Sequence, residues 1–236
     1  IIKQVNKMNN KKIVEKAKSS TSFQHKFWQK ESTTRNFDHP VIDFFAKQRI
    51  QFIEKYIPIN EVSNILDVGS GRGYSGIHLP KKSSITATDF SFTQLKKNPM
   101  KNKIVSTSQK LPFKDKMFTL VNEWELLHHL PDPKKTVEEM SRIAKKYLVL
   151  FEPNRQNPGQ FCFSIIKKEE RNVLRHHKKM MYKLVQDIDF KILTCETVGW
   201  VFPNRMPEII LPLAKKLPFK LPIIGLSNVL ICKRNE

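Results

Sequence analysis

Residues 65–76 read Ile-Leu-Asp-Val-Gly-Ser-Gly-Arg-Gly-Tyr-Ser-Gly, and they carry the clearest structural signal of the chain. The first four residues are apolar apart from one acid, which is typical of a short buried parallel strand. Glycines follow at alternate positions, and glycine permits a positive φ and a close approach of the backbone to a ligand. We expect a helix to begin near Tyr74, with its free N–H groups facing this loop. The pattern predicts a strand, a glycine turn and a helix arranged around a ligand.

A second short strand, residues 85–89, ends on an acid, Asp89. A carboxylate can accept two hydrogen bonds from a cis-diol such as that of a ribose. Ser91-Phe-Thr-Gln94 follows at once and reads as a capping box that opens the next helix. The glycine turn and Asp89 together predict a pocket for a nucleoside-containing cofactor.

Two other ligand classes also use glycine-rich turns. Residues 71–76 formally match the dinucleotide pattern G-x-G-x-x-G, but that fingerprint starts directly after the strand. Counted from Gly69, the sixth position is Tyr74, so the register fails. A Walker phosphate loop is absent from the sequence because no Gly-Lys-Ser/Thr follows. The remaining alternative is that the glycines only make a tight strand-to-helix turn.

Residues 67–73, Asp-Val-Gly-Ser-Gly-Arg-Gly, resemble the D/E-x-G-x-G-x-G motif of class I S-adenosylmethionine-dependent methyltransferases. Two later stretches resemble landmarks of the same family. Residues 109–118 contain its Leu-Pro-Phe, and residues 119–133 contain its Leu-His-His-Leu-Pro-Asp-Pro. The chain looks closest to methyltransferase type 11, in the ubiquinone/menaquinone-biosynthesis-like branch. The resemblance implies an enzyme that uses S-adenosyl-L-methionine as its methyl donor.

The resemblance also implies which residues bind this cofactor. Asp89 would hold the ribose hydroxyls, and Thr107 and Ser108 would contact the adenine. The whole predicted set is Asp67, Gly69, Gly71, Gly73, Asp89, Thr107, Ser108 and Asn122. The family commonly has an Asp where this chain has Thr107, whose hydroxyl can accept a hydrogen bond but carries no charge. A second departure, Thr119, replaces an Asp that is mainly structural in the family.

Alternating strand and helix patterns predict an α/β fold. We expect a doubly wound Rossmann-like sheet, mostly parallel with an antiparallel last strand, and helices on both faces. Apolar spacing predicts helices over residues 41–56 and 134–146. We expect a basic, disordered N-terminal arm at residues 1–22 and a single methyltransferase domain at 23–236. That domain would carry an N-terminal helical cap (23–58) and a C-terminal lid-like insertion (200–225).

The formal net charge is +20, from 42 Lys and Arg against 22 Asp and Glu. Such an excess favours anionic partners, such as phospholipid, phosphorylated glycan or nucleic acid. Ordinary lysine-rich solvated faces are the alternative. The three cysteines show no C-x-x-C spacing, so we expect neither a disulfide framework nor a bound metal. We see no signal peptide and no apolar run long enough for a membrane span, and expect a cytoplasmic protein, peripheral at an anionic membrane.

Methyl transfer from a sulfonium is an in-line displacement, in which alignment supplies much of the acceleration. A general base is needed only where the acceptor must lose a proton. His128 is the candidate base, because an unperturbed imidazole has a pKa of about 6.5. The alternative is that His128 and His129 only pack the loop. Residues 122–125 lack the Asn/Asp-Pro-Pro-Tyr/Phe motif of many amino-group methyltransferases.

The C-terminal part is the least standard. Residues 167–186 predict one basic helix, and residues 190–198 and 227–233 predict the closing pair of strands. Residues 200–225 between these strands are long, apolar and punctuated by prolines, with lysines at 215, 216 and 220. Such a connection is usually a lid or a binding surface, and apolar residues beside lysines suit an anionic membrane interface. An ordinary cover packed on the sheet is the alternative.

The predicted function is S-adenosylmethionine-dependent methyl transfer to an anionic or amphiphilic small molecule, such as a lipid or glycan intermediate. Two alternatives stay open. One is an RNA or other nucleic-acid methyltransferase that uses the positive charge. The other is a non-catalytic protein that binds S-adenosylmethionine.

Overall fold

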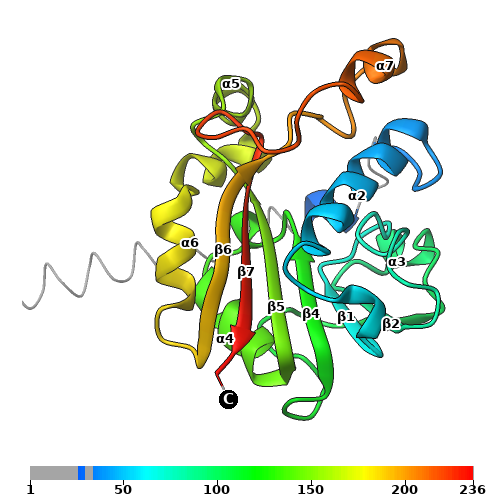
Figure 1. Cartoon of the computed structure of the whole chain (residues 1–236), viewed down its shortest axis with the longest axis vertical. Coiled ribbons are helices and arrows are strands. Elements are labelled where there is room, and N and C mark those ends of the chain that lie inside the picture. The colour runs from blue at the N-terminus through cyan, green and yellow to red at the C-terminus, as the bar shows by residue number, and fades with distance from the viewer. Residues whose placement is uncertain (1–25, 30–33, 236) are drawn as a thin grey trace, which may run out of the picture.

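The structure is a computed structural model that describes residues 26–29 and 34–235 (Figure 1). The predicted disordered arm at residues 1–22 lies outside the described residues. A seven-stranded sheet occupies the centre, with its strands in the order β3-β2-β1-β4-β5-β7-β6. The strands are β1 (Asn64–Val68), β2 (Ser84–Asp89), β3 (Asn102–Val105), β4 (Phe118–Trp124), β5 (Ala144–Pro153), β6 (Phe190–Val198) and β7 (Ser227–Arg234).

The strand directions confirm the predicted fold class. All pairs among β1 to β5 are parallel, whereas β7 pairs antiparallel with both β5 and β6. The chain order reverses beside β1, which has β2 on one side and β4 on the other. In open α/β sheets, ligands bind outside the carboxyl ends of the strands at such a reversal. The topology therefore places the expected site at the ends of β1 and β4.

Helices cover both faces of the sheet, as predicted (Figure 1). The consecutive residues Leu120 and Val121 of β4 point to opposite faces and belong to different hydrophobic cores. Leu120 packs in the core with α2 (Pro40–Ile53). Val121 packs in the core with α4 (Pro133–Ile143) and α6 (Lys178–Val185). The two cores pack on opposite faces of the sheet and so fix the position of its carboxyl edge.

Proline opens both α2 and α4 in the first turn, where its missing N–H costs nothing. The side chain of Asp132 accepts a hydrogen bond from Lys135 N at 3.3 Å and caps α4, as the sequence indicates. α4 ends at Ile143, three residues before the predicted end. The backbone of Ala144 is already extended and pairs with Phe118, so β5 begins directly at the end of the helix.

No α-helix follows the glycine turn. Residues 74–78 form consecutive turns, so the expectation of a helix from Tyr74 is wrong. The backbone bonds here span three residues, from Gly76 N to Gly73 O and from Leu79 N to Gly76 O. The short connection to β2 contains Gly76 and Pro80, and both residue types disfavour a helix. The glycine turn therefore lacks the helix N-terminus that commonly follows such turns.

The predicted basic helix at residues 167–186 is divided into two elements. A 3-10 helix, η3 (Lys168–Arg175), precedes α6. Between them, His176 is buried with its Nδ1 3.2 Å from Glu152 Oε2. His177 caps α6 by accepting a hydrogen bond from Met180 N at 3.1 Å. The break exists because one histidine turns toward a buried carboxylate while the next begins a new helix.

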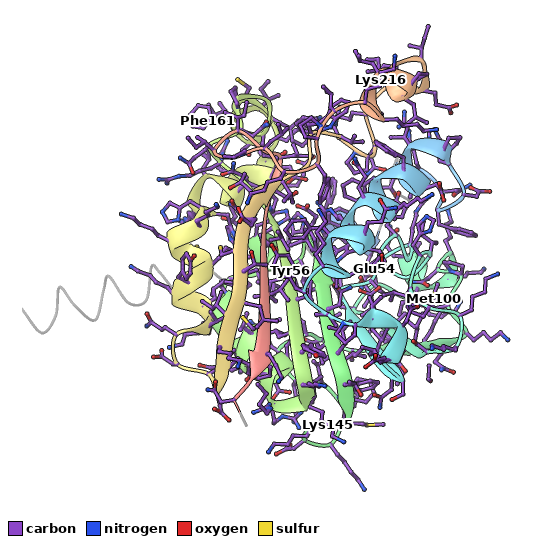
Figure 2. The ribbon with its side chains drawn as sticks, in the orientation of Figure 1. Glu54, Tyr56, Met100, Lys145, Phe161 and Lys216 are labelled. Carbon is purple, nitrogen blue, oxygen red and sulfur yellow. The ribbon has the colours of Figure 1, made fainter. Side chains whose placement is uncertain are left out.

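Two segments project beyond the carboxyl ends of β5 and β6. α5 (Pro158–Ile166) follows β5, and residues 200–225 follow β6 and contain η4 (Glu208–Ile210) and α7 (Leu211–Ala214). Phe161 and Lys216 lie at this end of the molecule, and Lys145 lies at the opposite end (Figure 2). β6 and β7 form the predicted closing pair. Among the described residues, no helix is both long enough and apolar enough to cross a bilayer.

Candidate active site

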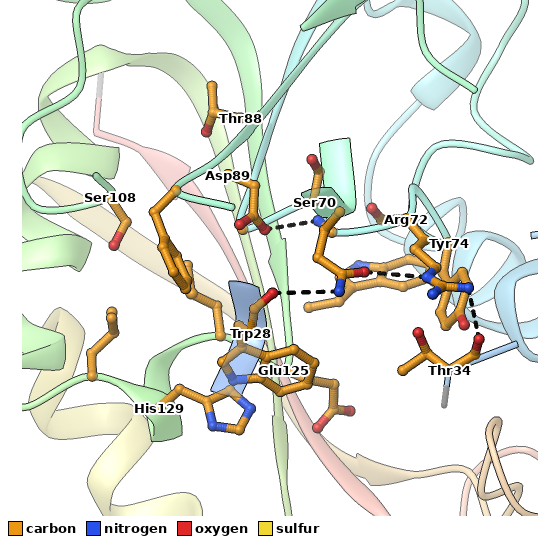
Figure 3. Close-up of a pocket in the computed structure, with 18 of the residues that line it drawn as sticks. Trp28, Thr34, Ser70, Arg72, Tyr74, Thr88, Asp89, Ser108, Glu125 and His129 are labelled. Carbon is orange, nitrogen blue, oxygen red and sulfur yellow. Dashed lines mark hydrogen bonds between the residues drawn. The ribbon is translucent and has the colours of Figure 1, made fainter. Parts of the chain in front are cut away.

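A cavity lies at the carboxyl ends of β1, β2 and β4, where the strand order reverses (Figure 3). One half of its wall is the glycine turn with Asp89 and residues 106–108. The aromatic residues Trp28, Phe45 and Trp124 also line the cavity, and we call this part of the lining the aromatic half. The position agrees with the ligand site expected for an open α/β sheet.

The three glycines of the turn have positive φ but different surroundings. Gly71, with φ of +48°, lines the cavity, and a Cβ added there would have no atom within 4 Å. A Cβ on Gly69 would come within 2.8 Å of Leu126, and one on Gly73 within 2.7 Å of Asn98 Oδ1. Gly73 does not lie on the cavity wall. Gly71 therefore opens the backbone toward a ligand, whereas Gly73 is needed for packing behind the turn.

Asp89 joins the second strand to the glycine turn. Its Oδ2 accepts a hydrogen bond from Gly71 N at 2.9 Å, and its Oδ1 accepts one from Ser91 N at 2.8 Å. Burial raises the pKa of this carboxyl, while the backbone N–H groups oppose the rise. Each oxygen keeps a further lone pair, because a carboxylate can accept about four hydrogen bonds. Asp89 lines the cavity and fits the predicted ribose contact.

Asp67 and Asn122 lie behind the wall, and we correct their predicted contact with cofactor to a supporting role. Both are 1% exposed, and neither lines the cavity. Asn122 donates to Asp67 Oδ1 at 3.1 Å, and the Ser75 hydroxyl donates to the other oxygen. Burial raises the pKa of Asp67 to about 7, although both hydrogen bonds lower it. The pair ties β1 and β4 together beneath the glycine turn.

The residues after β3 complete the first half of the cavity. Thr107 and Ser108 line it, as predicted for adenine contacts, and the contact itself stays a prediction. Ser108 Oγ lies 3.2 Å from Thr136 Oγ1. Ser106, which the sequence did not single out, also lines the cavity, and its buried hydroxyl has no hydrogen-bond partner among the described residues. An orphaned buried hydroxyl at this wall fits a polar ligand.

The second half of the cavity is assembled from distant segments. Gln94 Nε2 donates to Trp28 O at 3.4 Å, and Arg72 Nη1 donates to Thr34 O at 2.7 Å (Figure 3). Tyr74 OH donates to Asn204 Oδ1 at 3.1 Å. The glycine-turn region thus holds both the N-terminal segment and the start of the C-terminal insertion. No single stretch of sequence carries this part of the site.

Arg49 is a buried cation that sequence reasoning missed. It is 2% exposed, and its Nη2 lies 2.5 Å from Glu125 Oε1 and 2.7 Å from Ser227 Oγ. Its guanidinium also stacks 4.1 Å from the centre of the Phe45 ring. Burial lowers the pKa of Arg49, while Glu125 opposes the shift. A sequence signal for it does exist. Arg49 occupies a position of α2 that the helical spacing of the apolar residues predicts to be buried, and a buried cation needs a partner.

His128 is not placed to act as a general base, and this corrects the prediction. It is buried and does not line the cavity. Its Nδ1 lies 3.0 Å from Glu152 Oε2, and its Nε2 lies 3.4 Å from Glu170 Oε2. Burial opposes the charge on the ring, yet these carboxylates raise the pKa of His128 to about 10. His128 is therefore an imidazolium held between two acids.

His129 is the histidine that faces the cavity. Burial, followed by the charge of His128, lowers its pKa to about 3, so the ring is neutral. The ligand atoms of His128, His129 and Glu170 lie within 4.8 Å of one another, and metal ions accept these donor types. His128 already has a carboxylate at each ring nitrogen, which accounts for the cluster by ion pairing. The expectation of no bound metal stays a prediction.

The comparisons with known proteins agree with this geometry. Residues 66–150 match a family model described as a methyltransferase domain. The match runs from β1 to β5 and includes the glycine turn, Asp89, Thr107 and Ser108. It does not separate the branches of the family, so the ubiquinone/menaquinone-biosynthesis-like branch stays a prediction.

Solved structures share the fold. A Thermotoga maritima S-adenosylmethionine-dependent methyltransferase, described as a possible histamine N-methyltransferase, has a TM-score of 0.64 and 17% identity over 83% of this chain and 91% of its own. A Pyrococcus horikoshii protein has a TM-score of 0.63 and 15% identity over 89% and 99%. Magnesium protoporphyrin IX methyltransferase from Synechocystis, with bound SAH, has a TM-score of 0.56 and 12% identity over 82% and 83%. At such low sequence identities, the similarity to these structures shows a shared fold and no more.

Proposed function

Because the chain is a class I S-adenosylmethionine-dependent methyltransferase, we propose that it methylates an amphiphilic small molecule, a lipid or glycan intermediate, whose apolar part lies against the aromatic half of the cavity. One observation carries the proposal: the glycine turn and a wall of large aromatic side chains enclose the same cavity. Aromatic side chains present large apolar surfaces to a ligand.

The polar groups on this wall support an apolar rather than a strongly anionic contact. The Arg72 guanidinium donates to Thr34 O and Gln94 Oε1, and Glu125 is paired with Arg49. These charged groups already have protein partners. We therefore place the charged part of an amphiphilic acceptor outside the aromatic half of the cavity.

When bound, S-adenosylmethionine supplies a methyl group that is already activated on a sulfonium. Asp89 would hold its ribose, the open face of Gly71 would let it approach the backbone, and Thr107 and Ser108 would contact its adenine. Trp28, Phe45 and Trp124 would align the acceptor and exclude water. His129, with a pKa of about 3, is too weak a base to take a proton at neutral pH. In this proposal the acceleration comes mainly from alignment.

A methyl-label transfer assay tests the acceptor class. Purified protein and labelled S-adenosylmethionine would be incubated separately with fractions of membrane lipid, soluble metabolites and RNA. We expect label in the lipid fraction. Label only in polar metabolites would contradict an amphiphilic acceptor, although the enzyme would still be a methyltransferase.

The cofactor contact is tested separately by calorimetry with S-adenosylmethionine. Asp89→Ala removes two charge-assisted hydrogen bonds, so we expect about 100-fold weaker binding. The matched control is Glu54→Ala, which removes an exposed carboxylate at the end of α2. Unchanged affinity in Asp89→Ala would remove Asp89 from the ribose site.

A nucleic-acid acceptor is the second candidate, supported by the formal net charge of +20. It predicts label in the RNA fraction and an affinity for RNA that falls steeply with salt. Weak, salt-insensitive association with RNA would reject it.

A further inference from the structure

The end of the molecule formed by α5 and the insertion exposes an unusual number of large apolar side chains. Single exposed apolar residues are ordinary, whereas gathered ones mark an interaction site. On α5, Ile166 is 74% exposed, and on the insertion, Ile209 is 88% exposed. We call the following set the apolar tip: Phe161, Ile165, Ile166, Ile209, Leu213 and Ile223.

Hydrogen bonds and a cation–π contact join the ends of the insertion to the α5 region. Asn157, the N-cap of α5, donates from Nδ2 to Ile224 O at 2.7 Å. Asn154 Nδ2 donates to Ile223 O at 2.7 Å. The Arg205 guanidinium lies 4.6 Å from the centre of the Phe163 ring, across the same junction. The two ends of the insertion are therefore joined to the α5 region, and Phe161 of α5 and Lys216 of the insertion lie at the same end of the molecule (Figure 2).

The charges around the apolar tip are mostly positive. Lys215 and Lys216 follow α7 and are exposed, and Lys168 follows α5 and is exposed. The insertion contains one acid, Glu208, which is paired with His39 at 3.0 Å. Apolar side chains bordered by exposed lysines are complementary to a bilayer with anionic headgroups, since the apolar groups enter the acyl boundary and the lysines meet the phosphates.

The same insertion also forms part of the cavity wall. Pro203 and Asn204, at its start, line the cavity. Asn204 Oδ1 accepts hydrogen bonds from Arg35 N at 3.0 Å and from Tyr74 OH at 3.1 Å. One segment thus connects the aromatic half of the cavity to the apolar tip.

We propose that the apolar tip docks the enzyme on an anionic lipid bilayer, so that an amphiphilic acceptor reaches the cavity from the membrane. The inference rests on the proposed function, because a membrane-borne acceptor gives the docking its use. It commits to a bilayer rather than to a protein partner, because isoleucine and leucine beside exposed lysines suit a surface that is apolar beneath an anionic layer.

Vesicle flotation tests the docking. The full chain would be mixed with vesicles of phosphatidylcholine alone or of phosphatidylcholine with phosphatidylglycerol. We expect binding to the anionic vesicles only. Ile209→Ser/Leu213→Ser and Lys215→Glu/Lys216→Glu should each weaken partition about tenfold or more. The matched control, Lys145→Glu/Lys146→Glu, changes the same number of exposed lysines at the opposite end and should bind like the wild type.

Two further measurements separate the possible failures. Calorimetry with S-adenosylmethionine on every variant checks that the cavity remains folded, because none of the substituted residues lines it. Wild-type protein that stays off anionic vesicles, or tip variants that bind them normally, would overturn the docking. Loss of a dimer in the tip variants, seen by light scattering, would assign the apolar tip to a second copy instead.

The docking and the proposed function can fail separately. Label transfer to detergent-solubilised lipid would still support the proposed function if docking failed. Vesicle binding without any lipid labelling would reject the proposed function alone.

Discussion

The half of the cavity around Asp89 and the half around Trp28 are built in different ways. Around Asp89, backbone N–H groups and short polar side chains from the loops after β1, β2 and β3 make the wall, with bonds such as Gly71 N to Asp89 Oδ2. Around Trp28, bulky rings from distant segments meet and are held by long side chains such as Gln94 and Arg72. The first half depends on backbone positions and the second on side-chain packing, so substitutions should affect the two halves differently.

The largest effect is expected where the aromatic half meets the sheet, at Arg49. Arg49→Met removes a buried cation from Glu125 and Ser227, and should lower the free energy of unfolding by about 3 kcal/mol. Urea unfolding of the wild type and the variant measures this change in the free energy of unfolding. Arg49→Met/Glu125→Gln should recover part of this loss, because the carboxylate no longer lacks its partner. If Arg49→Met and Arg49→Met/Glu125→Gln lost the same free energy of unfolding, the ion pair would not be what stabilises this part of the cavity wall.

The next effect concerns the buried charges behind His129. The pKa of His128 is raised from 6.5 to about 10, so its contribution to stability is complete below pH 6.5 and is lost as pH rises toward 10. Between these limits the unfolding free energy should fall by about 1.4 kcal/mol per pH unit more than in His128→Gln. Urea unfolding at several pH values from about 7 to about 9 measures the slope. Parallel slopes in the two proteins would show that His128 is neutral when folded.

Two glycines of the same turn separate ligand binding from folding. In Gly73→Ala the new Cβ would meet Asn98 Oδ1, so we expect a loss of stability of about 2 kcal/mol. In Gly71→Ala the Cβ has open space on the protein side, so the stability loss should be about 1 kcal/mol, while cofactor binding weakens tenfold or more. Thermal unfolding and calorimetry measure the two effects. The reverse ranking would reject the assignment of Gly71 to the ligand side.

The smallest effect is expected from restoring a family feature at Thr107. Thr107→Asp puts a carboxylate where the resembling family commonly has one, and should tighten S-adenosylmethionine binding by roughly fivefold. Thr107→Asn is the control, because it adds similar bulk without charge. Calorimetry on both variants decides the point, and equal affinities would place the adenine elsewhere on the wall.

The sequence could bring the residues of the Asp89 half together because each follows the end of a strand, and their contacts with the cofactor stay predictions. Each of these features lies at or just after the end of a strand: the glycine turn after β1, Asp89 at the end of β2, and residues 107–108 after β3. A local sequence pattern is therefore enough to predict where they lie. The mostly parallel sheet with an antiparallel last strand was also predicted, and the pairing of β7 with β5 and β6 agrees with it. Asp67 was in the right place but in the wrong role, since spacing does not say which side of a turn a side chain faces.

The remaining features depend on contacts between distant residues. His128 and His129 are adjacent, and what separates their roles is Glu152 on β5 and Glu170 in η3, which draw His128 inward. Arg49 lies within the apolar helix α2, and its partners Glu125 and Ser227 come from distant parts of the chain. No local signal pairs residues so far apart in the chain. The helix expected from Tyr74 is absent for the opposite reason, because the local glycine and proline outweigh the strand-and-turn pattern that predicted it.

The turns at residues 74–78 also bear on ligand discrimination. A helix N-terminus after a glycine turn favours phosphates, because its free N–H groups and dipole attract negative charge. Here the chain makes turns instead, and Asn98 holds Gly71 O through its Nδ2 at 3.1 Å. A dinucleotide would find no helix end for its pyrophosphate, whereas S-adenosylmethionine carries no phosphate and loses nothing. The turns at residues 74–78 therefore lack the helix N-terminus that would attract a phosphate to this side of the glycine turn.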